Sequence, residues 1–190
     1  MQNAPRALQI GQMAPDFEQD TTNGSVRFHQ WIGRSWCVLF SYPKNLEATS
    51  VAELAQAAAL KPEWALRAVK VIGLCIDTSD EQARWQRQVQ EAQGFLPNFP
   101  VITDTDRSVS VLYGTVRRDD PYHIVRRVFV IDPYKKIRLM RTNPSSIGCD
   151  FHGILHAIDR LQRIDGLKPL LPAGASRPAG MGYGVAGLRF

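Results

Sequence analysis

The sequence predicts an α/β protein built on a central mixed sheet with helices on both faces. Short apolar runs alternate with segments of helical periodicity, an order typical of strands joined by crossover helices. One pair of apolar runs is joined by a turn-like segment instead, which adds an antiparallel hairpin. The chain has 190 residues, 44% hydrophobic and 22% charged. This composition is ordinary for a globular domain with a sizeable core.

The first half of the chain alternates predicted strands and helices. Trp36–Phe40 and Val69–Ile76 are short, continuous apolar runs, which favour buried strands. A helix rich in alanine and leucine is expected from Ala48 to about Leu60. A second helix should start after Thr78, where capping residues precede two acids, and end near Gly94.

The second half adds a strand, a short helix and the hairpin. Phe99–Ile102 is a short strand candidate, and Arg107–Tyr113 is a short helix candidate. Val125–Ile131 and Lys136–Met140 flank the turn-like segment Asp132–Lys135, so we expect them to pair antiparallel.

The C-terminal part of the chain contains a predicted amphipathic helix and then a segment of different composition. Phe151–Ile164 places five apolar residues on one helical face: Phe151, Ile154, Leu155, Ile158 and Leu161. The stretch that follows is rich in glycine and proline and has no periodicity. We therefore expect one domain over residues 1–166 and a short C-terminal arm or tail over residues 167–190.

The charge pattern bears on partners and location. The net charge of +5 comes from scattered basic residues, whereas a nucleic-acid surface needs a denser patch, so nucleic-acid binding is not expected. No segment approaches the length of an apolar membrane span. The N-terminus lacks the charged-then-apolar pattern of a secretory signal. We expect a cytoplasmic protein that does not bind a membrane.

The cysteines and histidines show no metal-binding pattern. Cys37, Cys75 and Cys149 share no CxxC spacing, and such a set fits reduced thiols. His152 and His156 lie four residues apart on the last helix but off its apolar face, which favours a solvated pair over a metal site. No metal and no cofactor are expected.

A longer set of motifs carries a family resemblance. The matching segments are Ala14–Phe17, Phe28–Gly33, Val38–Pro43, Lys70–Asp77, Asn98–Asp104, Asp106–Gly114, Arg126–Pro133, Lys135–Leu139 and Phe151–Leu161. In order and spacing they resemble the one-cysteine peroxiredoxins of the AhpC/TSA family, a branch of the thioredoxin-like superfamily. The resemblance covers about residues 8–165. It implies a thioredoxin-like fold and a homodimer.

The family's reactive motif, Pro-x-x-x-Thr-x-x-Cys followed by Thr-x-Glu-Leu, is altered in this chain. Its framework is retained at Pro43, Glu53 and Leu54, which fixes the register. The resemblance then places Ser50 at the position of the peroxide-reactive cysteine and Glu47 at the position of the threonine. Tyr42 takes the place of the histidine that usually precedes the proline.

These substitutions change the expected chemistry. A cysteine reacts with peroxide as a thiolate and cycles through a sulfenic acid, and a serine hydroxyl can do neither. The family layout also gives Arg126 as one pocket arginine and Cys149 at the position of the other. A carboxylate gained and an arginine lost both disfavour a thiolate at position 50. We expect thiol-peroxidase activity to be weak or absent, in a scaffold retained for binding or interaction.

Three alternatives concern the altered pocket. Glu47 and Arg126 could form a buried ion pair that leaves the pocket inert. Alternatively, the pocket could bind a small organic substrate and perform acid/base chemistry such as elimination or cyclisation. Arg126 would then bind a carboxylate, Glu47 or Tyr42 would move a proton, and Pro43, Lys44 and Cys149 would line the pocket.

The third alternative is a peroxidase that uses Cys149, close to Arg126, as a relocated reactive thiol. A compact neutral replacement of the arginine is the simpler interpretation of Cys149, because buried cysteines are usually inert. Ser50 and Glu47 could also act as nucleophile and base on one helical turn. With no histidine nearby to complete a triad, we interpret Ser50 as a small polar residue near the helix cap.

Overall fold

The structure, a computed structural model, describes residues 7–43, 48–94, 96–116, 124–144 and 147–166. The predicted C-terminal arm over residues 167–190 lies outside these ranges. The helices of the described residues include none that is long and apolar enough to cross a bilayer.

A seven-stranded mixed sheet organises the described residues in the order β2-β1-β5-β4-β3-β6-β7. Its strands are β1 Glu18–Thr21, β2 Gly24–Arg27, β3 Trp36–Ser41, β4 Val69–Cys75, β5 Val101–Thr103, β6 Arg126–Ile131 and β7 Ile137–Asn143. β3, β4 and β5 pair in parallel, whereas β6 pairs antiparallel with both β3 and β7. The predicted mixed sheet and its hairpin are confirmed.

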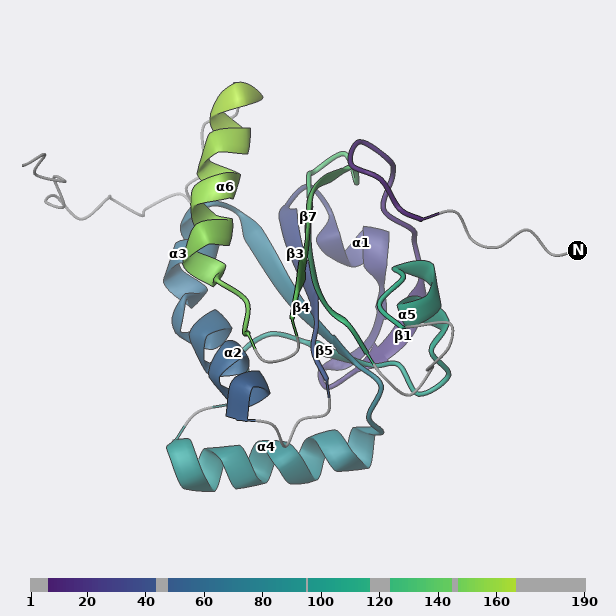
Figure 1. Ribbon diagram of the computed structural model, residues 1–190, viewed down its shortest axis with the longest axis vertical. Helices are drawn as coiled ribbons and strands as arrows, with labels where there is room; N and C mark the ends of the chain where they lie inside the picture. The colour runs from purple at the N-terminus through teal and green to yellow at the C-terminus, as the bar shows by residue number, and fades with distance from the viewer. Residues whose placement is uncertain (1–6, 44–47, 95, 117–123, 145–146, 167–190) are drawn as a thin grey trace, which may run out of the picture.

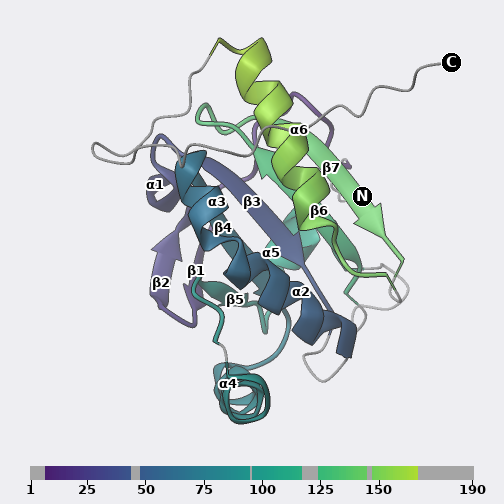
Figure 2. The same cartoon turned by 90° about the vertical axis from the view of Figure 1, so that its left-hand side faces the viewer.

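Helices cover both faces of this sheet. They are α1 Phe28–Ile32, α2 Ala48–Ala59, α3 Lys61–Leu66, α4 Ser79–Gln93, α5 Ser108–Leu112 and α6 Phe151–Ile164. α2, α3 and α6 lie on one face, α1 and α5 lie on the other, and α4 lies across one end of the sheet (Figures 1 and 2). This arrangement confirms the predicted thioredoxin-like α/β fold.

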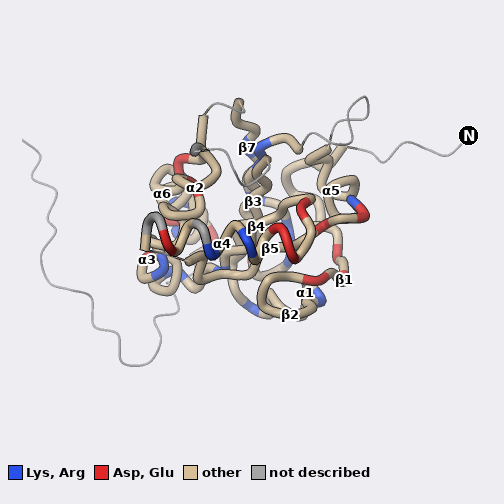
Figure 3. The backbone as a smooth tube through the Cα atoms, turned by 90° about the horizontal axis from the view of Figure 1, so that it is seen from below, with Lys and Arg blue, Asp and Glu red and all other residues tan. Residues whose placement is uncertain are grey.

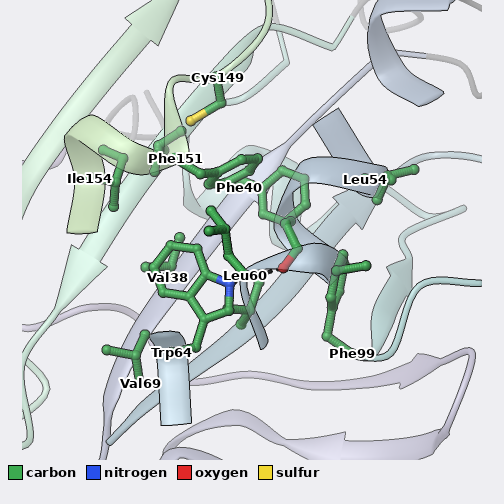
Figure 4. Packing of buried hydrophobic residues seen from close by; sticks show 14 of the residues in the cluster. Val38, Phe40, Leu54, Leu60, Trp64, Val69, Phe99, Cys149, Phe151 and Ile154 are labelled. Atoms are coloured by element: carbon green, nitrogen blue, oxygen red, sulfur yellow. Dashed lines mark hydrogen bonds between the residues drawn. The ribbon is translucent and has the colours of Figure 1, made fainter. Parts of the chain in front are cut away.

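Each face of the sheet carries its own layer of core. The layer under α2, α3 and α6 contains Phe40, Trp64 and Phe151, and the indole of Trp64 donates to the carbonyl of Ala57 at 2.9 Å (Figure 4). The layer under α1 and α5 contains Phe28 and Phe129, among others. Aromatic side chains of this size each bury a large apolar area, so they dominate the stabilisation of both layers.

Capping groups fix both ends of α4, as predicted, and also the start of α6. The Thr78 hydroxyl accepts from the backbone of Glu81, whose side chain accepts from the Thr78 backbone, which forms a capping box at the start of α4. Gly94 ends α4 in the left-handed conformation, with φ 71°. Asp150 caps α6 by accepting from the backbone of Gly153 at 2.9 Å. The cap at Asp150 also fixes the entry of the chain from the site into α6.

Four elements were not predicted from the sequence: β1, β2, α1 and α3. The two strands form a short hairpin of mostly polar residues, with Glu18 paired to Arg27 and Thr21 to Gly24, so they lack an apolar run. α3 begins directly after α2 with Pro62 in its first turn, where a proline is tolerated.

Candidate functional site

Ser50 lies in the first turn of α2, where the chain leaves the carboxyl end of β3. Its side chain is fully buried. The hydroxyl donates to the carbonyl of Pro43 at 3.3 Å and accepts from Nη2 of Arg126 at 3.1 Å. Both the proton and a lone pair of this hydroxyl are therefore engaged within the protein.

Arg126 is the first residue of β6 and connects Ser50 to Glu53. Its Nη1 donates to Oε2 of Glu53 in an ion pair whose side chains are 1% and 3% exposed. Ser50 and Glu53 can both meet one guanidinium because residues three apart in a helix share a face. A buried charge pair of this kind requires good hydrogen bonding to offset its desolvation, and the donors of Arg126 supply it.

The second oxygen of Glu53 fixes the segment before α6. Oε1 accepts from the backbone nitrogen of Cys149 at 2.7 Å. Gly148 allows this approach, because a Cβ at that position would lie 3.1 Å from Cγ of Glu53. Glu53 therefore joins three segments far apart in the sequence, namely α2, β6 and the loop that enters α6.

Cys149 lies at the edge of the core, beside Phe151 (Figure 4). Burial raises the pKa of its thiol to about 12, and the negative charges of Glu53 and Asp150 add to that effect. Arg141 acts in the opposite direction but more weakly. At neutral pH this side chain is a thiol.

Tyr42 belongs to a neighbouring polar cluster that also contains Cys75, Gln82 and Asp77. Burial raises the pKa of the Tyr42 phenol well above its ordinary value, and Cys75 and Asp77 raise it further. Nε2 of Gln82 contacts Sγ of Cys75 at 2.7 Å, and the pKa of Cys75 is raised to about 12, first by burial and then by Asp77. A Cβ at Gly73 would lie 3.2 Å from the Tyr42 ring, so the missing side chain leaves space for the phenol.

The sequence-predicted site residues are thus placed in two groups. Arg126 and Cys149 bond to Glu53, and Ser50 and Pro43 join them through the Arg126–Ser50 and Ser50–Pro43 bonds, whereas Tyr42 lies in the second cluster. Lys44 and Glu47 lie outside the described residues, so the expected pairing of Glu47 with Arg126 stays a prediction.

Glu53 is the residue whose role was missed from the sequence. It was recognised as a match to the family motif, but not as the carboxylate that pairs with Arg126. Its retention in a motif that differs at three other positions, Glu47, Ser50 and Val51, was the available signal.

The histidines of α6 are placed as expected. His152 and His156 both lie on its exposed face. Among the described residues, no group of three or more His, Cys, Asp and Glu side chains is arranged to hold a metal ion.

A mixed seven-stranded sheet with helices on both faces defines the class of protein as a thioredoxin-like α/β protein. Residues 10–140 match the AhpC/TSA family, and the chain belongs to that family. Its fold is that of the peroxiredoxins, as the resemblance implied.

Curated relatives support this assignment across most of the chain. A 1-Cys peroxiredoxin of Dictyostelium discoideum is 36% identical over 167 residues, covering 87% of this chain and 69% of the relative. Peroxiredoxin-6 of Mus musculus is 38% identical over 175 residues, covering 87% and 78%. The predicted kinship with one-cysteine peroxiredoxins is confirmed.

Solved structures give the same result. A yeast mitochondrial 1-Cys peroxiredoxin superposes with a TM-score of 0.78 at 38% identity, covering 89% of this chain and 84% of that one. A cysteine-to-serine mutant of the peroxiredoxin 6 of Arenicola marina superposes with a TM-score of 0.77 at 34% identity, covering 84% and 76%.

Proposed function

We propose that this chain is a peroxiredoxin-family protein without thiol-peroxidase activity, whose scaffold serves in binding or interaction. In this proposal Ser50 occupies the position of the peroxide-reactive cysteine. The observation that carries it is the buried hydroxyl of Ser50, bonded to both Arg126 and the carbonyl of Pro43. A serine hydroxyl needs an adjacent general base to act as a nucleophile, and it cannot form a sulfenic acid.

The three cysteines of the chain are poorly suited to replace the missing peroxide-reactive cysteine. Cys37, Cys75 and Cys149 are all buried, and burial is the largest cause of the raised pKa of each thiol. With a pKa of about 12, roughly one thiol in 100,000 is ionised at pH 7. Because the thiolate is the nucleophile, Cys75 and Cys149 are poorly suited to attack peroxide.

The direct test is peroxide consumption by the full-length protein. Hydrogen peroxide and an organic hydroperoxide would be supplied with dithiothreitol, glutathione or thioredoxin as reductant. We expect no turnover beyond the background with heat-denatured protein. Robust turnover by the wild type would refute the proposal. Its loss in Cys149→Ser or in Cys75→Ser would then identify the thiol responsible.

A second candidate function is non-redox acid/base chemistry on a small organic substrate. Tyr42 favours it, because its phenol is buried beside Cys75 and Gln82 and stays protonated. A protonated phenol can serve as a general acid. Arg126 would bind a substrate carboxylate and Glu47 would act as base, which requires Arg126 to exchange its contacts with Glu53 and Ser50.

A ligand screen tests this second candidate. Small organic acids would be tested for an increase in Tm, with Tyr42→Phe and Arg126→Lys as comparison variants. An acid that stabilises the wild type and neither variant supports the candidate. Stabilisation that is equal in all three proteins rules out this use of the two residues.

A cytoplasmic homodimer completes the proposal. β7 forms one edge of the sheet, and strand edges are ready surfaces for pairing with a second chain. Light scattering on the eluted full-length protein would measure its mass, and a monomer across the accessible concentration range would contradict the dimer.

A further inference from the structure

The strongest unassigned feature lies at the end of the sheet away from Ser50, around the turn between β6 and β7. Three large apolar side chains are exposed there: Ile10 at 65%, Met13 at 63% and Tyr134 at 73%. We call these three residues, together with Arg34, Lys135 and Lys136, the turn patch. β6 separates it from Arg126 by about 17 Å of strand.

Backbone hydrogen bonds hold the segment that carries Ile10 and Met13 against the turn between β6 and β7. The backbone of Gly11 donates to Ile137 at 2.7 Å, and that of Ala14 donates to Lys135 at 2.7 Å. Met13 forms an antiparallel bridge with Lys136. Figure 1 shows the N-terminal segment lying against the β6–β7 turn. Ile10 and Met13 are therefore held next to the turn that presents Tyr134.

The turn that carries Tyr134 is rigid. Oδ1 of Asp132, a buried residue, accepts from the backbone nitrogens of Tyr134 and Lys136, both at 2.9 Å. Lys135 has a φ of 67°, a left-handed conformation that costs a non-glycine residue about 1 kcal/mol. The backbone of Tyr134 is thus fixed while its ring faces solvent. A tyrosine side chain has only two torsions to fix, so it loses little entropy when a partner covers it.

Basic residues lie next to the turn that carries Tyr134. The ammonium of Lys135 donates to the carbonyls of Gly33 and Pro133, which places Arg34 beside the turn. The Lys136 side chain is exposed.

The acidic residues nearby are already engaged. Asp132 accepts from Arg138 at 3.1 Å, and Asp16 accepts from the backbone of His29 at 2.8 Å. Partial burial is the main cause of the lowered pKa of Lys135, and Lys70, whose ammonium donates to the carbonyl of Trp31, lowers it further, whereas Asp132 and Asp16 act in the opposite direction. Four cations (Arg34, Lys70, Lys135 and Lys136) thus lie near two carboxylates, Asp16 and Asp132, and Asp132 is also paired with Arg138, so the rim of the turn patch carries a net positive charge.

We propose that the turn patch docks an acidic protein segment that also carries apolar side chains. Tyr134, Met13 and Ile10 would contact the apolar side chains, and Arg34, Lys135 and Lys136 would face the carboxylates. A second copy of this chain fits poorly, because two positive rims would repel each other. The patch is also small and built on a turn rather than on an amphipathic helix, which argues against a membrane surface.

This inference rests on the proposed interaction role but uses a different face from Ser50. The two proposals can therefore fail separately. Peroxidase activity of the wild type would refute the proposed lack of thiol-peroxidase activity, whereas only a binding measurement tests the turn patch.

The experiment selects binders to the full-length protein from a random peptide library displayed on phage. Peptides enriched in both acidic and apolar residues are expected. The most enriched peptide would be titrated by fluorescence anisotropy against Tyr134→Ser and Lys136→Glu, with an expected weakening of about tenfold for each variant. Added salt should weaken the binding further, because exposed charges are screened.

Two variants near α4, at the opposite end of the sheet, provide matched controls: Leu96→Ser for Tyr134→Ser, and Arg84→Glu for Lys136→Glu. Figure 3 shows basic and acidic residues interspersed along α4, so this region lacks a single-sign field. Both controls should bind the peptide like the wild type.

Three outcomes would overturn the proposal. One is the absence of acidic–apolar enrichment, and another is equal weakening in patch and control variants. The third is binding to vesicles containing phosphatidylserine that depends on Tyr134 while no peptide is enriched, which would assign the patch to a membrane instead.

Discussion

Arg126 and Ser50, 76 residues apart in the sequence, are joined by a buried hydrogen bond of 3.1 Å between Nη2 and the serine hydroxyl. The guanidinium is therefore aimed at the atom that differs between a serine and a cysteine. A sulfur at the same place would meet a cationic donor and the start of helix α2, and both favour a thiolate.

Ser50→Cys should therefore create a reactive thiol. Because Arg126 donates directly to this position, we expect the pKa of the new thiol to lie below that of the buried Cys149, and a sulfenic acid to form with hydrogen peroxide. Dimedone labelling followed by mass spectrometry would locate the modified residue. Ser50→Ala is the control of similar size. Labelling of the wild type to the same extent would contradict the prediction.

Removing one partner of the buried Arg126–Glu53 ion pair should destabilise the protein strongly. Arg126→Met leaves the Glu53 carboxylate buried without its cation, which should lower the free energy of unfolding by about 3–5 kcal/mol. The double variant Arg126→Met/Glu53→Gln should recover much of that loss, because glutamine still accepts from the backbone of Cys149. Urea unfolding measures both.

The matched control for this pair is Arg27, which contacts Glu18 with both side chains more than 60% exposed. Arg27→Met should change stability by less than about 1 kcal/mol. An equal loss of unfolding free energy in Arg126→Met and Arg27→Met would show that the buried pair stabilises the protein no more than the exposed pair.

The thiol of Cys149 should resist alkylation in the folded protein. With a pKa of about 12, roughly one thiol in 10,000 is ionised at pH 8. Iodoacetamide should therefore modify Cys149 much more slowly than it modifies the urea-unfolded chain, where the pKa is ordinary. Peptide mapping separates Cys149 from the other two cysteines. Fast labelling of the folded protein would reopen a peroxidase role for this residue.

Stability should depend on pH through Asp165, at the end of α6. Hydrogen bonds from Arg138, at 2.6 and 2.9 Å, lower the pKa of Asp165 from its usual value of 3.8. A lowered folded-state pKa adds stability above pH 3.8, and that stability is lost as the pH falls through the folded-state value.

Asp165→Asn should therefore lower the free energy of unfolding by about 0.5–1 kcal/mol at pH 7 and by progressively less towards pH 2. Asp20→Asn, an exposed substitution on β1, should differ from the wild type in stability by the same small amount at both pH values. A difference between Asp165→Asn and wild type that is the same at both pH values would contradict the assigned ion pair.

The sequence was informative where one local signal determined the structure. The apolar runs of β3, β4 and β6, the capping residues of α4 and the amphipathic face of α6 each predicted their element. β1 and β2 were missed because they are polar and are stabilised by pairing with each other, which no local pattern records. α3 was missed because a proline follows so closely after α2.

The site was predictable only in part, for a similar reason. Ser50, Arg126 and Cys149 were identified through the family resemblance. The partnership of Glu53 with Arg126 depends on the packing of α2 against β6, across 73 residues of sequence. Spacing within a motif does not specify such a contact.

The close contact between Tyr42 and Gly73 has an evolutionary consequence. The phenol fills the space that a side chain at position 73 would occupy, between β3 and Val101 of β5. The two positions are thus expected to change together during divergence. A sequence with a bulkier residue at position 73 should carry a smaller one at position 42, and such paired substitutions would trace when this branch acquired its tyrosine.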